Sequence, residues 1–306
     1  MSEASPHPPH RVLILGATGM LGAMVADVLS REPSIALTVT ARNPARPGVA
    51  GASAALPCIT FDAERDPLPD LRAYDWVINA IGIIKPYIKD DDAASTERAL
   101  RVNALLPHLL AAAAAAAGVR VLQIATDCVY TGRTGMYTET ALHDALDVYG
   151  KTKSLGEVPG TTMHHLRCSI IGPELQGHVS LLDWFRKQPT GATLTGFVNH
   201  RWNGVTTYHY ARLCAGIITH GLAVPPRLHV VPTGLVTKAA MLEGFAAAYG
   251  RMDLDIRHGE AQTVADRTVQ TEHVEINATV WRAAGYATPP TFHEMIAELA
   301  AHPFNC

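Results

Sequence analysis

The chain has 306 residues, of which 48% are hydrophobic and 17% are charged, so it can bury a sizeable core and is not an intrinsically disordered protein. A typical domain of about 150 residues predicts two domains or one large α/β unit. The 25 Lys and Arg residues nearly balance the 28 Asp and Glu residues, which gives a formal net charge of −3. Without a basic cluster, the composition argues against a nucleic-acid partner.

Cysteine usage and the first residues predict a cytoplasmic protein. The five cysteines are an odd number and form no CxxC motif, which argues against a disulfide framework and a structural zinc site. Residues 1–10 are polar and proline-rich, unlike a signal peptide, and we expect them to be a disordered lead-in. The apolar stretch 104–119 is mostly alanine and is interrupted by Pro107 and His108, so we expect no membrane span. We also expect no metal site.

Apolar strands alternate with helices along the first half of the chain. Helices are expected directly after the first strand and over 90–117, and an irregular connection over 43–57. Strands separated by helices at this spacing predict an α/β fold with a Rossmann-type, doubly wound parallel sheet. The expected strands lie at 12–15, 35–42, 57–61, 74–82, 119–132 and 162–172.

The pattern changes after about residue 172, where segments become shorter and carry more Trp, His, Asn and Pro. We predict a Rossmann domain over 11–172 and a smaller substrate-binding lobe over 173–306, part of which can return to the main sheet. Trp184 is expected in the core. A last amphipathic helix is expected within 287–303.

The segment GATGMLG follows the first strand and opens the first helix. Gly16 would make the tight turn, Gly19 would let the backbone approach a pyrophosphate, and Gly22 would allow close helix–strand packing. The free N–H groups of the helix would then face the phosphates. The strand–turn–helix context favours this interpretation over a plain turn of small residues.

Arg42 ends the second expected strand, where the adenosine ribose would lie. An acidic residue there would hold a 2′-hydroxyl, whereas an arginine suits a 2′-phosphate. Arg42 therefore favours NADPH, with NADH as the second option; a solvated loop arginine is the alternative interpretation.

Tyr149 and Lys153 stand four residues apart in YGKTK, on one face of an expected helix. Lys153 could lower the pKa of the tyrosine and bind a nicotinamide ribose. Thr126, at the end of a buried strand, could hydrogen-bond the carbonyl oxygen that Tyr149 protonates. The three groups suit hydride transfer to a ketone with Tyr149 as general acid; YxxxK alone could also be an exposed helix pair.

These motifs resemble the extended short-chain dehydrogenase/reductases, and ATDCVYTG with YGKTKSLGE resembles their dTDP-4-dehydrorhamnose reductase branch. The resemblance implies NADPH-dependent reduction of the C4 keto group of a nucleotide-linked 4-keto-6-deoxy sugar. A homodimer is one option for the assembly. The residues that match the branch are Thr126, Asp127, Tyr130, Thr131, Gly132, Tyr149, Gly150, Lys153, Gly156 and Glu157.

The same resemblance implies which residues line the cofactor. They come from the glycine-rich turn, from a segment near the adenine, from the end of the fourth strand and from the following helix. In that order they are Gly16, Thr18, Gly19, Met20 and Leu21; Asp62 and Ala63; Ala80, Ile81 and Gly82; and Asn103.

Cys128 departs from the branch, which usually has an aromatic residue there; the usual proline before the tyrosine is also missing. Related sugar dehydratases carry Glu at the position of Cys128, so the dehydratase alternative is disfavoured. Related epimerase–reductases carry a Cys and a His, which here would be Cys128 and His178. A thiolate and a histidine could move protons next to the keto group, although an isolated cysteine is more often a buried apolar filler.

Three further residues are candidates for substrate binding. Arg201 could pair with a diphosphate and Trp202 could stack on a base or sugar, but HRWNG could equally be a turn packed between lobes. Lys85 could reach a phosphate or be a plain loop lysine. A non-catalytic NADP-binding subunit that regulates a partner enzyme stays open as a different class of function.

Overall fold

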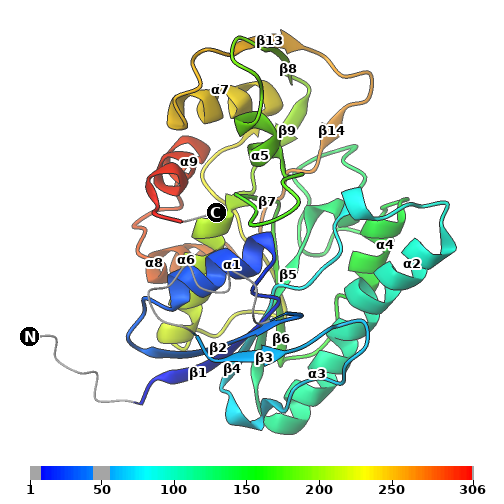
Figure 1. Cartoon of the computed structure of the whole chain (residues 1–306), viewed down its shortest axis with the longest axis vertical. Coiled ribbons are helices and arrows are strands. Elements are labelled where there is room, and N and C mark those ends of the chain that lie inside the picture. The colour runs from blue at the N-terminus through cyan, green and yellow to red at the C-terminus, as the bar shows by residue number, and fades with distance from the viewer. Residues whose placement is uncertain (1–7, 44–55, 305–306) are drawn as a thin grey trace, which may run out of the picture.

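The computed structural model of the protein describes residues 8–43 and 56–304. Its centre is a seven-stranded sheet in which every pairing is parallel, and helices cover both faces (Figure 1). This architecture confirms the predicted α/β class. From one edge to the other the strands are β11 (Arg227–His229), β6 (Met163–Arg167), β5 (Arg120–Ala125), β4 (Trp76–Asn79), β1 (His10–Leu15), β2 (Ile35–Ala41) and β3 (Cys58–Thr60).

The strand order reverses at β1. The chain runs from β1 through β2 to β3 on one side and then crosses to β4 on the other side of β1. Helices bury both faces of the inner strands, and β1, β2, β4 and β5 are accordingly largely apolar. Every residue of β4 is buried, and so is every residue of β6 although it carries His and Arg side chains. A crevice outside the carboxyl ends of the strands is expected at this reversal.

Two layers of helices enclose the sheet. On one face, α1 (Met20–Leu29) packs against α6 (Thr207–Thr219), which in turn contacts α8 (Val274–Ala283). On the other face, α3 (Leu106–Ala117) packs on β5, and α4 (Val148–Leu155) lies beside α2 (Ala93–Ala99) (Figure 1). The two apolar clusters on either side of the sheet make the core.

One continuous helical run carries the alanine-rich stretch. It joins α2, a π-helical turn over Leu100–Leu105, and α3. Within the described part of the chain, the run Ala93–Ala117 is the one helix with the length and hydropathy of a membrane span, and half of its most apolar window is buried in the protein. The absence of a membrane span, the cytoplasmic location and the homodimer stay predictions.

The chain after residue 172 divides between the main body and a smaller lobe. Helix α6 and strand β11 belong to the main body, because β11 extends the large sheet beside β6. The smaller lobe lies at the end marked by α7 and β13 in Figure 1. The lobe contains α5 (Leu181–Arg186), α7 (Lys238–Ala248), α9 (Phe292–Ala301), β8 (Thr193–Phe197), β9 (His200–Trp202), β10 (Val205–Thr206), β12 (Val236–Thr237), β13 (Asp255–Gly259) and β14 (Ala265–Asp266). Strand β7 (Ile170–Ile171), just before residue 172, pairs with β10.

The element boundaries differ from the predictions in instructive places. Strand β5 ends at Ala125 because Thr126 caps a 3₁₀ turn over Asp127–Val129, so the strand expected over 119–132 is shorter. Trp184 is 42% exposed, and its predicted place in the core is wrong. Most of the lead-in and of the connection 43–57 lies outside the described residues. Two further 3₁₀ turns span Leu71–Ala73 and Lys85–Tyr87.

Candidate active site

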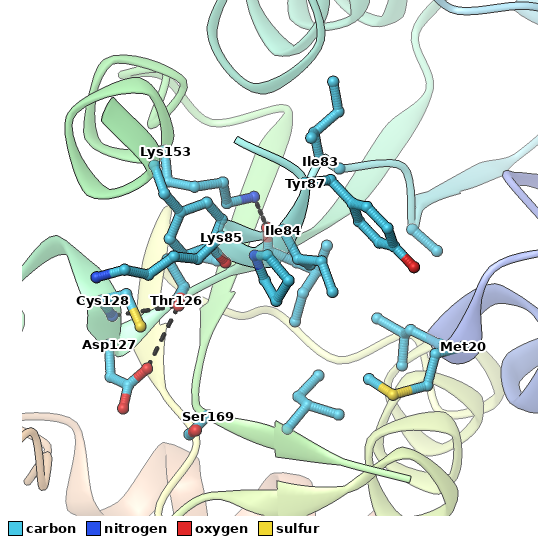
Figure 2. Close-up of a pocket in the computed structure, with 18 of the residues that line it drawn as sticks. Met20, Ile83, Ile84, Lys85, Tyr87, Thr126, Asp127, Cys128, Lys153 and Ser169 are labelled. Atoms are coloured by element: carbon cyan, nitrogen blue, oxygen red, sulfur yellow. Dashed lines mark hydrogen bonds between the residues drawn. The ribbon is translucent and has the colours of Figure 1, made fainter. Parts of the chain in front are cut away.

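A cavity of about 410 Å³ opens where the carboxyl ends of β4, β5 and β6 meet the start of α1. Figure 2 shows Thr126, Asp127, Cys128 and Lys153 grouped on one side of this cavity, with Met20 on the opposite side. The crevice expected from the strand order is therefore present, and polar groups gather on one wall of it.

Thr126, Tyr149 and Lys153 all line this cavity. The Tyr149 phenol lies close enough to the Thr126 side chain for that hydroxyl group to lower the pKa of the phenol. The Lys153 ammonium donates to the carbonyl oxygen of Ile124 at 3.0 Å. Ile124 belongs to β5 and precedes Thr126 with one residue between them. The structure thus brings together three residues that the sequence places up to 27 positions apart.

The start of α4 fixes the position of the tyrosine. Asp147 caps this helix by accepting from the Gly150 amide at 2.7 Å. The same carboxylate pairs with Lys85 at 2.7 Å, which joins the loop after β4 to the helix. Lys85 also lines the cavity. Tyr149 and Lys153 follow the cap on one helix face, since residues four apart are neighbours.

Burial controls the protonation of the groups in this wall. It lowers the pKa of Lys153 to about 8 and raises the pKa of Tyr149 above its usual value. Burial, followed by the charge of Asp127, raises the pKa of Cys128 to about 12. At neutral pH the phenol and the thiol are therefore both neutral, and the phenol can donate a proton.

A second cavity of about 160 Å³ continues the groove along β1 and β2. Ala80 and Gly82 line both cavities, so the two are parts of one elongated groove. Met20 and Leu21 line only the first cavity. The other sequence-predicted cofactor residues that line the second are Gly16, Thr18, Gly19, Arg42, Asp62, Ala63 and Ile81.

The glycine-rich turn fits a dinucleotide pyrophosphate. Gly16 has φ +87°, and a Cβ on Gly22 would lie 2.1 Å from the Gly16 carbonyl oxygen. A Cβ on Gly19 would meet nothing nearer than that same oxygen at 3.6 Å, so no protein contact explains this glycine. Helix α1 also begins without a side-chain cap, which leaves N–H groups free for an anion.

Asn103 has a different place from the one predicted. Its side chain accepts from the Ile83 amide at 2.8 Å and donates to the Ile83 carbonyl at 2.9 Å. It lines neither cavity. From the π-helical turn, Asn103 anchors the loop that follows β4, so its effect on a cofactor would be indirect.

Three predicted substrate residues are not among those that line the main cavity. Arg201 pairs with Asp266 at 3.4 Å in a separate cleft of the smaller lobe. Trp202 is 5% exposed and packs edge-on against Phe292, as in the packed-turn alternative. His178 pairs with Asp183 at 3.0 Å. Cys128, in contrast, lines the cavity.

The structure also reveals site residues that the sequence did not single out. Asp127 is buried and lines the cavity; it stands in a recognised motif, but no role was assigned to it. The charges of Arg267 and Lys238 act on its carboxyl group from the smaller lobe. No local sequence signal marks either cation. Over residues 8–43 and 56–304, no group of three or more His, Cys, Asp or Glu side chains is placed to hold a metal ion.

The smaller-lobe side of the cavity also carries two residues without a predicted role. Glu174 and Gln176 both line it. Glu174 is buried and accepts from the Ser180 amide at 2.9 Å, so it holds its own loop in place.

Solved structures show the same fold. A dTDP-4-dehydrorhamnose reductase of Bacillus anthracis in complex with NADP has a TM-score of 0.71, with 16% identity over 95% of this chain and 98% of that one. WbmG of Bordetella bronchiseptica in complex with NAD has a TM-score of 0.72, with 16% identity over 97% of this chain and 94% of that one. At these identities the likeness concerns the fold.

Sequence comparisons identify the family. A dTDP-4-dehydrorhamnose reductase of Streptomyces griseus is 30% identical over 322 aligned positions, which cover 99% of this chain and 96% of that protein. Methionine adenosyltransferase 2 subunit beta of Rattus norvegicus is 29% identical over 58% of this chain and 50% of that protein. The family model described as RmlD substrate binding domain matches residues 10–171. The resemblance inferred from the motifs is confirmed, and the chain belongs to the RmlD substrate binding domain family.

Proposed function

We propose that the protein is an NADPH-dependent reductase of the keto group of a sugar nucleotide, acting at C4 of a 4-keto-6-deoxy sugar. The observation that carries the proposal is the convergence of Thr126, Tyr149 and Lys153 in a cavity that adjoins the groove over the glycine-rich turn. The Streptomyces griseus reductase, matched over nearly its whole length, supports the same reaction.

Thr126, Tyr149 and Lys153 each have a role in this reaction. When bound, NADPH would supply the hydride for the keto carbon. Thr126 and Tyr149 hold the keto oxygen, and the neutral phenol of Tyr149 gives its proton to the alkoxide that forms. One ammonium hydrogen of Lys153 is taken by the Ile124 carbonyl, which leaves further donors for a ribose hydroxyl.

Arg42 supports the choice of cofactor. It is exposed and lines the second cavity with Thr18 and Asp62, at the end of β2. An arginine at this place can pair with a ribose 2′-phosphate, so we infer a preference for NADPH and allow slower turnover with NADH.

Two alternatives are less well supported. Epimerisation through Cys128 and His178 would need a thiolate, but the pKa of Cys128 is raised to about 12, and His178 is paired with Asp183 outside the cavity lining. A regulatory subunit is suggested by the rat protein, whose match covers 58% of this chain. Because Tyr149 and Thr126 line the same cavity, an enzyme is better supported than a non-catalytic regulatory subunit.

The test is NADPH consumption with a dTDP-linked 4-keto-6-deoxy sugar in D₂O. We expect turnover without deuterium at C3 or C5, and a kcat that falls by about 10²–10⁴-fold in Tyr149→Phe. Tyr74→Phe is the control, because that phenol packs on the far apolar cluster. NADPH binding without turnover would support the regulatory subunit, and deuterium at C3 or C5 would support the epimerase–reductase.

A further inference from the structure

One cationic side chain of the main cavity has no role in the proposed reaction. Among the described residues that line this cavity, Lys85 and Lys153 carry the cationic side chains (Figure 2). Lys153 is buried and donates to the Ile124 carbonyl oxygen, and in the proposed reaction its other donors bind the cofactor ribose. Lys85 lies on the 3₁₀ turn after β4, and its side chain is 61% exposed. Lys85 is therefore the cation that an anionic part of a substrate could reach.

The partner of Lys85 is the residue that caps α4. The Lys85 Nζ donates to Oδ2 of Asp147 at 2.7 Å, while Oδ1 of the same carboxylate accepts from the Gly150 amide at 2.7 Å. Because the two oxygens have separate partners, the cap does not depend on Lys85. A Cβ on Gly150 would lie 2.4 Å from the Cys128 carbonyl oxygen, so the first turn of α4 is packed directly on the turn after β5. Tyr149 should therefore stay in place when Lys85 moves.

The ion pair of Lys85 and Asp147 is weak enough to exchange. Its side chains are 61% and 25% exposed, and exposed pairs contribute little to stability because water screens them. A diphosphate offers an ammonium group several anionic oxygens, which accept strong hydrogen bonds. The lysine stem is flexible, so Lys85 can turn from Asp147 to such a group by rotation of its own side chain.

The surroundings of the cavity leave a diphosphate to Lys85. Arg201, the earlier candidate for this contact, pairs with Asp266 in a separate cleft. The start of α4 is acidic, because the carboxylates of Asp90 and Asp147 both accept from amides of its first turn. Without Lys85 this rim of the cavity would repel an anion. The cofactor pyrophosphate is expected over the glycine-rich turn, in the second cavity, which Lys85 does not line.

We propose that Lys85 binds the diphosphate of the sugar nucleotide, and that Asp147 holds Lys85 at the cavity until the substrate enters and takes its place. The inference rests on the proposed function, from which it takes the substrate class. In the free protein Asp147 has two tasks, and in the complex it keeps only the cap on α4. Lys85 is then a substrate-binding residue, and Asp147 is its positioning residue.

Calorimetry with dTDP-glucose and UDP-glucose tests this exchange without turnover, because neither sugar carries a keto group. Lys85→Met should weaken their binding by about 10–100-fold, the effect of one hydrogen bond to a charged group, and should leave NADP⁺ binding unchanged. Lys89→Met is the control, because Lys89 is exposed on the same loop and does not line the cavity. In turnover, Lys85→Met should raise KM more than it lowers kcat.

Asp147→Asn separates the exchange from a simple loss of charge. The amide oxygen can still cap α4, but the ion pair with Lys85 is gone, so both sugar nucleotides should bind up to about fivefold more tightly. In the Lys85→Met background the same change removes only the repulsion between Asp147 and the diphosphate, so the gain should be smaller. This double-mutant cycle measures the coupling between the two side chains.

The inference is supported if Lys85→Met weakens binding, the control does not, and the gain from Asp147→Asn is larger when Lys85 is present. It is overturned if Lys85→Met binds both sugar nucleotides like the wild type, if NADP⁺ binding falls in parallel, or if the gain from Asp147→Asn is equal in the two backgrounds. A wild type that binds neither sugar nucleotide would also overturn it. The proposed function is decided separately, by NADPH consumption with a 4-keto sugar nucleotide.

Discussion

Replacing Glu157 with glutamine would remove one charge from a buried ion pair that holds the end of α4 against β6. The side chains of Glu157 and Arg167 are 5% and 1% exposed, and the Arg167 Nε donates to Glu157 at 3.0 Å. The guanidinium also donates to the Tyr130 hydroxyl at 2.7 Å. Glu157→Gln keeps the shape of the network and leaves Arg167 without a buried counter-charge.

The expected loss in the free energy of unfolding is about 3–5 kcal/mol, as found when one partner of a buried ion pair is removed. Although burial alone would raise the pKa of Glu157, the Arg167 guanidinium lowers it below the usual value of 4.5. A lowered folded-state pKa gives stability that is present above pH 4.5 and is lost as the pH falls through the folded-state value. The penalty of the variant should therefore be full at neutral pH and shrink on acidification.

Urea unfolding at neutral pH and below pH 4 measures this difference. The control is Glu97→Gln, which removes the same charge from a pair with Arg101 whose side chains are 73% and 49% exposed, and should cost about 0.5 kcal/mol or less. A loss under about 1 kcal/mol for Glu157→Gln at neutral pH would refute the reasoning, as would a penalty that does not shrink in acid.

Two further predictions concern the cofactor groove. Arg42→Asp should shift the ratio of kcat/KM from NADPH toward NADH, and an unchanged ratio would show that Arg42 does not contact the 2′-phosphate. Gly19→Ala should unfold like the wild type, because its Cβ meets nothing nearer than 3.6 Å, yet should bind NADPH more weakly in calorimetry. Gly22→Ala should weaken NADPH binding and, unlike Gly19→Ala, should also be less stable than the wild type, because its Cβ would lie 2.1 Å from the Gly16 oxygen. Equal stability of the two variants would contradict the separate roles assigned to these two glycines.

The main sheet could be predicted because its signals are local. Most of its buried parallel strands are rich in apolar residues, and the glycine-rich turn of 16–22 marks the join of strand and helix. The approach of Tyr149 to Thr126 was predictable only through the motif, since the two lie on separate elements. Asn103 was placed in the cofactor groove, but the structure gives it an anchoring role at Ile83.

The smaller lobe could not be predicted in the same way. Its strands are two to five residues long, too short for a clear alternation of apolar and polar positions. Trp202 and Arg201 are adjacent in sequence, yet one packs in the core and the other pairs with Asp266. Lys238 contributes to the site because α7 docks beside it. The residues that surround Lys238 in the sequence give no signal of this role.

At the turn after β5, residues from the two halves of the chain meet around one carboxyl group. Thr126 and Asp127 come from the first half, whereas Arg267 and Lys238 reach Asp127 from the second. Arg267 also donates to the Tyr130 carbonyl at 2.9 Å, which ties the lobe to the turn mechanically as well as electrostatically. A substitution that shifts the lobe would therefore change the charge around Asp127 even if it touched no residue of the cavity. Changes in the lobe that alter substrate fit should for this reason also shift the pKa of the Asp127 carboxyl group.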